Sequence, residues 1–415
     1  MATVRTRHIA TTVLIIGGGL SGLTLAAVLG EAGVDVTCID HAPPFNQLQQ
    51  QYDGRTTAIS YSSHQVLQMA GVWEKMRLDC EPILDIRVAD GNSPFYLHFA
   101  SETDGNGAPF GWIIENRLMR RALFENTIRL KKKVRHIAPA EIKKFISDIS
   151  FAGILLKDGT KITAPLLVGA DGRHSATREW LGIPVQKTDY HQAAIVCNVA
   201  HTLDHENVAV EHFRAAGPFA ILPMTRSKTG EHRSSVVWTE HGIDAGTALK
   251  LSPEEFDRRL QELFGSHLGD VRHVSPPMKY PLHLMHAESY IGPRVALMAE
   301  AAHAIHPIAG QGLNLSMRDI AVLAELIIDH LKLGLDVGSP TLLKNYEKKR
   351  RSDTAVMAAV TNALNRLFSN DLKTVGLVRG FGLGMVEQFP LLKRYFAAQA
   401  MGISGVYPYI GRNRR

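Results

Sequence analysis

The stretch VLIIGGGLSGLTLAAVLG, residues 13–30, is the feature that most constrains how this chain can fold. It opens with Val13–Ile16, an apolar run typical of a parallel strand buried on both faces. Gly17, Gly19 and Gly22 follow with the spacing G-x-G-x-x-G. The first glycine permits a tight turn, the second lets the backbone approach a pyrophosphate, and the third lets a helix pack on the strand. The pattern predicts a dinucleotide-binding unit.

The residues that follow complete this unit. We expect a helix from Leu20 to about Glu31, ending near Gly33, with the free N–H groups of its first turn directed at phosphates. A second strand, Val34–Ile39, ends at Asp40, whose carboxylate can accept hydrogen bonds from a ribose. The motif fits both NAD and FAD, while the acid disfavours a 2′-phosphate. The competing interpretation is a glycine turn that serves packing alone.

Length and composition limit the function classes. A chain of 415 residues indicates two domains, or one large domain with an insertion. The net charge of +6 favours anionic partners, but no arginine-rich stretch with interleaved aromatic residues indicates nucleic-acid binding. Three widely spaced cysteines, without a CxxC or Cys/His cluster, favour a reducing cytoplasm over a disulfide framework or a zinc site. No apolar run reaches the roughly 18 residues of a membrane span.

A second glycine-rich loop lies far from the first, in AEAAHAIHPIAGQGLNLSMRD, residues 299–319. We expect a strand before it, Arg294 to Met298, and a long amphipathic helix after it, Leu313 to about Leu331. A glycine-rich loop at a helix N-terminus binds anions or polarised carbonyl groups. Two such sites in one chain suit FAD, which is long and has two chemically different ends. NAD with a conventional catalytic domain would not need the second site.

A third segment, LLVGADGRHSATR, joins a strand, Leu166 to Val168, to a helix that carries Ser175 and Arg178. Its Asp171-Gly172 pair is by itself only a turn signal. Between a buried strand and a helix, however, the pair resembles the DG motif of flavin hydroxylases.

These segments occur in the order found in the class A flavin-dependent aromatic hydroxylases: GGGLSG, DGRTTAIS, ENRLMRRAL, LLVGADGRHSATR and HAIHPIAGQGLNLSMRD. Within that class the chain resembles the ubiquinone-biosynthesis hydroxylase family, and the resemblance covers nearly the whole chain. It implies an α/β fold: a Rossmann-like FAD-binding domain, an inserted antiparallel-sheet substrate domain and a C-terminal helical segment. We predict these boundaries: FAD-binding domain 1–83, 116–183 and 291–345; substrate-binding sheet domain 84–115 and 184–290; C-terminal helical region 346–415.

Two parts of the chain leave alternatives open. The apolar residues Phe219 to Met224 and Trp238 can line a cavity for a polyprenyl tail or form ordinary sheet core. The late stretch 367–402 places basic residues beside an apolar stripe, which suits a membrane surface, a partner groove, packing against the FAD-binding domain or a subunit interface.

The resemblance also implies the site residues. Arg55 and Arg117 would contact FAD near its pyrophosphate and ribityl chain, Asp171 would help to hold the dinucleotide, and Pro307 to Asn314 would lie against the flavin ring. The full set expected to bind the cofactor is Gly17, Gly19, Gly22, Asp40, Arg55, Arg117, Asp171, Glu300, Gly312, Leu313 and Asn314. The residues expected at the reaction centre are Pro307, Gly310, Gln311 and Gly312. We predict no metal site, because His303 and His306 lack a third ligand nearby; His303 fits a supporting or packing role.

The chain departs from its family at Ala299-Glu300, where Gly-Asp is usual and the aspartate binds the ribityl or pyrophosphate region of FAD. Glu300 keeps the charge and adds a methylene. Ala299 adds a Cβ where the backbone needs close approach or a positive φ. We therefore hypothesise that FAD binds, but more loosely than in relatives with Gly-Asp.

The function implied is an FAD-dependent monooxygenase that hydroxylates the aromatic ring of a polyprenyl-phenol intermediate in ubiquinone biosynthesis through a flavin C4a-hydroperoxide. O2 would be the co-substrate and NAD(P)H or another electron donor the reductant, while the cofactor carries the difficult chemistry. Implied partners are the polyprenylated phenol and other ubiquinone-biosynthesis proteins. We expect the protein in the cytoplasm or attached to the inner face of the membrane. Two alternatives stay open: a hydroxylase of a small soluble aromatic, and a non-catalytic flavoprotein-like subunit.

Overall fold

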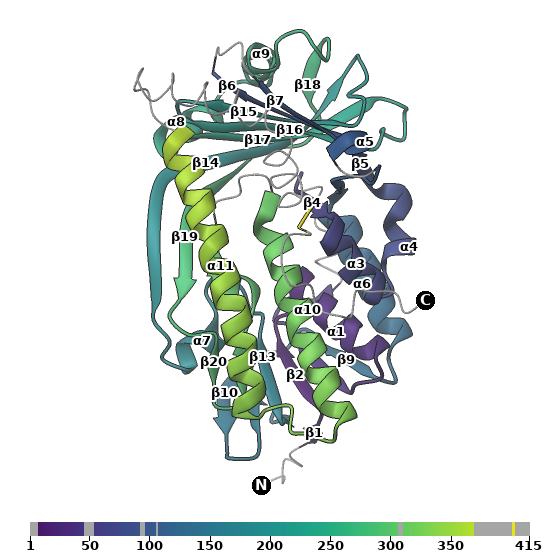
Figure 1. Ribbon diagram of the computed structural model, residues 1–415, viewed down its shortest axis with the longest axis vertical. Coiled ribbons are helices and arrows are strands. Elements are labelled where there is room, and N and C mark those ends of the chain that lie inside the picture. Colours follow the sequence, from purple (N-terminus) through teal and green to yellow (C-terminus); the bar gives the residue numbers. More distant parts are fainter. Residues whose placement is uncertain are drawn as a thin grey trace.

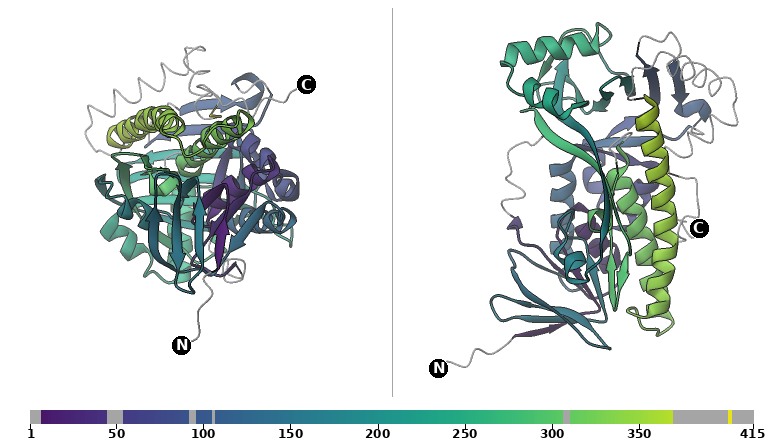
Figure 2. Two further views of the ribbon diagram at one scale, coloured as in Figure 1. Left: turned by 90° about the horizontal axis from the view of Figure 1, so that it is seen from below. Right: turned by 90° about the vertical axis from the view of Figure 1, so that its left-hand side faces the viewer.

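The computed structural model describes residues 7–44, 54–91, 96–104, 107–305, 310–368 and 401–402. A parallel sheet covered by helices forms one end of the molecule, and a large, mainly antiparallel sheet crosses the other end (Figure 1). The long helices α10, Gln311–Lys332, and α11, Pro340–Phe368, run side by side between these two parts (Figures 1 and 2). This arrangement confirms the predicted fold class, an α/β protein with a Rossmann-like part and an antiparallel-sheet part.

The parallel sheet consists of short apolar strands, as a sheet covered on both faces requires. Its neighbouring strands are parallel, except for the first pair, which is antiparallel. The strand order is β20 (Ile291–Gly292), β21 (Val295–Leu297), β13 (Leu166–Gly169), β2 (Val13–Ile16), β3 (Val36–Ile39) and β9 (Val134–Ile137). Strands from three separate parts of the sequence therefore meet in one sheet.

The first strand–helix–strand unit follows the sequence closely. Helix α1 covers Leu20–Glu31, as predicted. The next strand begins at Val36 and not at the predicted Val34, because the Val34 N–H donates to the Leu29 carbonyl at 3.0 Å and so completes the C-terminal turn of α1. Gly33, with φ +82°, lets the chain leave the helix at this point.

The glycine turn is sterically closed on one side and open on the other. A Cβ on Gly22 would lie 1.9 Å from the Gly17 carbonyl oxygen, so α1 can pack on β2 only without a side chain there. Gly17 has φ +107°, and a Cβ on it would lie 2.3 Å from the Ala170 carbonyl oxygen. A Cβ on Gly19 would meet nothing within 4 Å. These positions confirm the predicted packing and turn roles of Gly22 and Gly17.

The large sheet joins two distant ranges of sequence, since β6 pairs in parallel with β15. Its strands are β22 (His303–Ala304), β19 (Met278–Ala287), β14 (Val185–His201), β17 (His232–His241), β16 (Gly217–Met224), β15 (Val208–Arg214), β6 (Asp85–Asp90) and β7 (Tyr96–Ala100), with β18 (Val271–His273) paired to β14. Strands from 84–115 and 184–290 thus share a sheet, and β22 from 291–345 joins its edge. The exact domain boundaries stay a prediction.

The two faces of this sheet have different neighbours. Phe219, Ile221 and Trp238 pack in one cluster with residues of α8, Gly242–Ala248, and α9, Pro253–Phe264. For these three residues the sheet-core interpretation is therefore confirmed. The opposite face packs in a second cluster that includes Met224 of β16 and Ile113 of β8 (Gly111–Glu115).

Smaller elements complete the frame. A three-stranded sheet contains β4 (Thr56–Ser60), β8 and β5 (Glu81–Ile83), and a four-stranded sheet contains β1 (His8–Ala10), β12 (Lys161–Ala164), β11 (Ala152–Leu156) and β10 (Ile142–Ser147). The other helices are α3 (Tyr61–Met69), α4 (Trp73–Met76), α5 (Ser101–Asp104), α6 (Asn116–Arg129) and α7 (Ala176–Trp180), with 3-10 turns η1 (Arg77–Asp79) and η2 (Ala299–Ala301). The turn at 157–160 joins β11 to β12.

Most of the late stretch 367–402 lies outside the described residues, so its interpretations stay predictions. Met401 is described and buried, and its carbonyl accepts a hydrogen bond from the Ser62 N–H at 3.2 Å. Within the described ranges, none of the helices has the length and apolar character to cross a membrane.

We expect Gly22→Ala to lower the free energy of unfolding by about 1–3 kcal/mol, because its Cβ would overlap the Gly17 carbonyl and push α1 off the sheet. Gly19→Ala is the matched control. Its backbone, φ −72° and ψ −175°, accepts alanine, and the added Cβ meets open space. Chemical denaturation of the flavin-free protein measures both. Equal losses in the two variants would contradict the separate roles of these glycines.

Candidate active site

The helices that begin at the two glycine loops have uncapped N-termini. Gly19 precedes α1 and Gly310 precedes α10, and neither helix has a side-chain cap. By contrast, Ser60, Ser175 and Ser252 cap α3, α7 and α9. The N–H groups of a helix's first turn have no partner within their own helix, so the starts of α1 and α10 can be directed at an anion or a polarised carbonyl.

Asp40 lies beside the first glycine turn, as the sequence predicts. Its Oδ2 accepts a hydrogen bond from the Gly18 N–H at 2.7 Å, and its Oδ1 accepts one from the Ala42 N–H at 2.8 Å. The His136 Nε2 atom is buried beside Gly18 and Asp40 and has no hydrogen-bond partner among the described residues. Burial lowers the pKa of His136, which keeps the ring neutral. Open space at Gly19, an uncapped helix and an unsatisfied ring nitrogen fit a bound adenosine diphosphate group.

Asp171 holds its own loop together. Its carboxylate accepts hydrogen bonds from the Ser175 hydroxyl at 2.6 Å and from the N–H and hydroxyl of Thr177 at 2.9 and 3.0 Å. The buried Arg178 then donates to the Ala301 carbonyl at 2.9 Å, which ties this loop to the turn at 299–301. The sequence points to Asp171 as a cofactor ligand. The geometry shows that Asp171 organises its own loop, and its contact with the cofactor stays a prediction.

Arg55 and Arg117 are brought together by the pairing of β4 with β8. The Arg55 carbonyl accepts a hydrogen bond from the Asn116 N–H at 3.0 Å, so the two arginines lie where these strands meet α6. The Arg117 Nε donates to the buried Glu115 carboxylate at 2.6 Å, and Arg233 reaches the same group at 3.3 Å. Glu115 and Arg233 thus support the predicted arginine pair, and the sequence alone did not mark them.

The start of α10 is fixed against β4. The Asn314 side chain accepts a hydrogen bond from the Ser60 N–H at 3.0 Å and donates to the Ala58 carbonyl at 2.9 Å. Gly310, with φ +63°, sits close to Ala58. Gln311 is half-buried and Gly312 is exposed, while Pro307 and His306 lie outside the described residues. The Asn314 amide therefore anchors the helix, which leaves the backbone N–H groups of its first turn to face a ligand.

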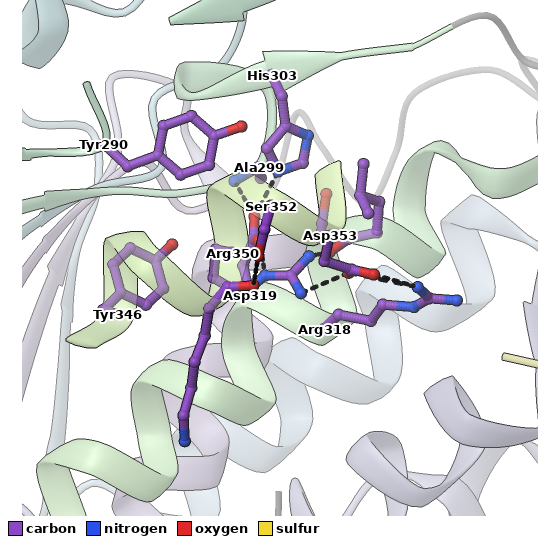
Figure 3. A network of polar contacts seen from close by, with 12 residues as sticks. Tyr290, Ala299, His303, Arg318, Asp319, Tyr346, Arg350, Ser352 and Asp353 are labelled. Carbon is purple, nitrogen blue, oxygen red and sulfur yellow. Dashed lines mark hydrogen bonds and ion pairs between the residues drawn. The ribbon is translucent and has the colours of Figure 1, made fainter. Parts of the chain in front are cut away.

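Ala299 has the unfavourable backbone conformation that its family position implies. Its φ is +54°, in the left-handed region that favours glycine. Its N–H donates to the Asp319 Oδ2 at 2.9 Å, which fixes the turn (Figure 3). Glu300 next to it is 56% exposed, and its nearest cation is the Arg173 Nη2 at 3.8 Å. The carboxylate expected to bind FAD therefore points to the surface beside the DG loop.

A buried ionic network holds this turn. The fully buried Asp319 accepts hydrogen bonds from His303 at 2.7 Å and from Arg350 at 2.6 Å, and Arg350 also bonds Asp353 at 2.6 Å (Figure 3). Burial opposes the charged form of Asp319, but His303 and Arg350 outweigh it and hold its pKa at about 2. His303 is thus a supporting residue, as predicted.

Sequence reasoning missed Asp319 and Arg350. A signal for Asp319 existed, since it falls at helical spacing between the apolar Leu315 and Leu323 and so had to be buried. Arg350 gave no comparable signal, because its partner lies on another helix. Within the described ranges, histidine, cysteine and acidic side chains form no group of three or more arranged to hold a metal ion.

Ala299→Gly should raise the free energy of unfolding by about 1 kcal/mol, because glycine adopts this left-handed backbone without strain. Ala302→Gly is the control: its φ of −99° suits alanine, so glycine there should cost roughly 0.5–1 kcal/mol. Thermal and urea unfolding measure both. Destabilisation by Ala299→Gly would show that the turn gains nothing from glycine.

Asp319→Asn should cost about 3–5 kcal/mol, because it leaves the buried Arg350 and His303 without their counter-charge. The folded-state pKa of Asp319 lies below its ordinary 3.8, so its stabilising effect is complete above that pH and is lost as the pH falls toward 2. Acid unfolding of the wild type should therefore steepen between pH 4 and 2. Asp329→Asn, an exposed acid on the same helix, should change stability by less than about 0.5 kcal/mol. A similar, small effect at both positions would contradict the network.

Comparison with known proteins follows this geometry. The family described as "FAD binding domain" matches residues 10–363. The chain is 46% identical over 390 residues to the ubiquinone hydroxylase UbiL of Rhodospirillum rubrum, covering 94% of this chain and 89% of the relative. It is 30% identical to the 3-demethoxyubiquinol 3-hydroxylase of Escherichia coli, covering 95% and 99%. In fold it is similar to the p-nitrophenol 4-monooxygenase PnpA of Pseudomonas putida, with a TM-score of 0.75, 19% identity and coverage of 96% and 99%.

A match over most of the chain, together with two glycine loops that open uncapped helices, identifies a flavoprotein aromatic hydroxylase: the chain belongs to the FAD-binding-domain family and, within it, groups with the ubiquinone hydroxylases.

Proposed function

We propose that this protein binds FAD across its two glycine loops and hydroxylates the aromatic ring of a polyprenylated phenol in ubiquinone biosynthesis. The observation that carries the proposal is the 46% identity to a ubiquinone hydroxylase over 94% of the chain. The open glycine turn and the two uncapped helices support it, because they fit the two ends of one long cofactor. FAD, once reduced by NAD(P)H or another donor, supplies the reactivity toward O2 and the ring.

The residues of the first glycine loop would hold the adenosine end. The N–H groups at the start of α1 would bind a pyrophosphate, and the open space at Gly19 leaves room for its approach. Asp40, which accepts a hydrogen bond from the Gly18 N–H, would also accept hydrogen bonds from the ribose. Arg55 and Arg117 would add positive charge near the middle of the cofactor, where Glu115 orients the Arg117 guanidinium.

The residues of the second loop would hold the reacting end. The N–H groups of the first turn of α10, at Gln311, Gly312 and Leu313, would bind the polarised edge of the ring system. Fixed dipoles of this kind stabilise charge that develops during a reaction. Asn314 keeps the turn rigid through β4. The apolar cluster beside β4 and β8 would exclude water from the same region.

Titration of the purified protein with FAD, followed by flavin absorbance, tests the binding. We expect stoichiometric binding, and we expect the double variant Ala299→Gly, Glu300→Asp to bind about five- to tenfold more tightly, an effect of roughly 1–1.4 kcal/mol, because it restores close backbone approach and a shorter acid. Ala302→Gly serves as the control. An unchanged affinity for FAD in the double variant would contradict the hypothesis that this turn weakens FAD binding.

Oxygen consumption then tests the reaction. With FAD and a reductant, a phenol that carries a prenyl tail should stimulate O2 uptake and yield a ring-hydroxylated product, detected by mass spectrometry. Equal or greater turnover of the tail-free phenol would favour a hydroxylase of small soluble aromatics. FAD binding without substrate-dependent O2 uptake or product would favour a non-catalytic subunit.

A further inference from the structure

One carboxylate on the large sheet stands apart from the others. Along β15 alternate residues share a face, and Ala209, Glu211 and Phe213 form one such set. Ala209 and Phe213 belong to the apolar cluster that also contains Met224 of β16 and Ile113 of β8. Glu211 therefore lies between two members of an apolar cluster, on the face opposite to α9.

The strands on either side of Glu211 offer its carboxylate no polar partner. Val88 of β6 and Ala220 of β16 are directly opposite it in the two ladders. Its side chain is half-buried, and among the described residues neither a hydrogen-bond donor nor a cation contacts it. Because the side chain is only half-buried, the carboxylate lies where a ligand can reach it, and a hydrogen bond from that ligand would satisfy it among its apolar neighbours.

Other buried acids of this region show what Glu211 lacks. Glu240, on the opposite face of the sheet, accepts a hydrogen bond from the Trp238 ring N–H at 2.8 Å and lies 3.4 Å from Arg214. Glu115 is paired with two arginines. Within the described part of the chain, Glu240 and Glu115 thus have partners and Glu211 has none, so its carboxylate is available to a ligand.

The apolar cluster connects Glu211 to the predicted reaction centre. Ala58 packs against this cluster, and its carbonyl accepts a hydrogen bond from Asn314 at the start of α10. Gly310, which precedes α10, lies close to the same alanine. Figure 1 shows the first turn of α10 at the end of the helix that faces the large sheet. The face that carries Glu211 is thus directed at the region where the flavin ring is expected.

We propose that Glu211 is a substrate-binding residue whose carboxylate accepts a hydrogen bond from the phenolic hydroxyl of the substrate. The proposal rests on the proposed function. The apolar neighbours Val88, Ala220 and Phe213 would contact the ring itself, and the hydroxyl group of the phenol would meet the Glu211 carboxylate. This contact would fix which edge of the ring faces α10, so Glu211 would influence the position that is hydroxylated.

The protonation of Glu211 adds a pH dependence. Burial raises the pKa of Glu211 to about 7. Among the described residues, the titratable groups that share its surroundings are Asp90, which is opposite Phe213 in the ladder with β6, and Tyr61 of α3, which packs on the apolar cluster. Neither side chain supplies a positive charge. The charged carboxylate, the stronger hydrogen-bond acceptor, therefore predominates only above about pH 7, and preference for a phenol should grow as the pH rises.

The experiment compares 2-geranylphenol with its methyl ether, which has the same ring and tail but no hydroxyl donor. Binding to the oxidised, FAD-loaded protein is measured by calorimetry without reductant, so turnover does not enter. We expect the wild type to prefer the phenol by about 10- to 100-fold at pH 8, the range for a hydrogen bond to a charged group, and by less at pH 6. Glu211→Leu should bind both compounds about equally. Glu211→Gln should keep a weaker preference that does not change with pH.

Glu240→Gln is the matched control, because it removes the same charge from the opposite face of the same sheet and should keep the wild-type preference and its pH dependence. A preference unchanged in Glu211→Leu would overturn the role of Glu211. Should that variant fold poorly, a pH dependence retained in the near-isosteric Glu211→Gln would overturn it equally. A wild type that binds and hydroxylates neither compound would overturn the proposed function instead, so the two failures are distinguishable.

Discussion

The bond between the buried Asp319 carboxylate and the Ala299 N–H is the interaction on which the second cofactor loop depends. It fixes Ala299, a residue with a left-handed backbone that is not glycine, in the turn that follows β21 of the parallel sheet. The carboxylate is kept charged by His303 and Arg350, and Arg350 comes from the neighbouring helix. A single buried acid thus joins a turn, α10 and α11, and its loss would release all of them together.

This turn is held from a second side by Arg178, whose guanidinium spans the DG loop and the Ala301 carbonyl. Asp171 in turn organises the helix that carries Arg178. The acids of this region therefore act mainly on the protein itself. They position backbone N–H groups, and these groups would contact the cofactor. Because these N–H groups are already in place, no further reorganisation energy is needed when charge develops on a ligand.

The two faces of the large sheet have different roles. One face buries Trp238 and Phe219 beneath α9, and its acid, Glu240, is paired. The other face combines apolar residues with Glu211, which has no partner within the described ranges. Because side chains alternate along a strand, neighbouring residues of one strand serve the stability of the sheet and the proposed binding of the substrate.

Strands and helices that depend on local patterns of residues can be predicted from the sequence alone. The strand at 13–16, the helix Leu20–Glu31 and the strand before the DG loop follow from apolar runs and glycine spacing, which act over a few residues. Even the strain at Ala299 was foreseeable, because that position normally holds glycine. The tertiary structure alone decided what the polar residues do. It turned Asn314 and Asp171 inward as anchors, paired Asp319 with Arg350 across 31 residues, and left Glu211 without a partner among the described residues. Hydrogen bonds and burial depend on residues that are distant in sequence, so their arrangement appears only once the strands and helices have packed.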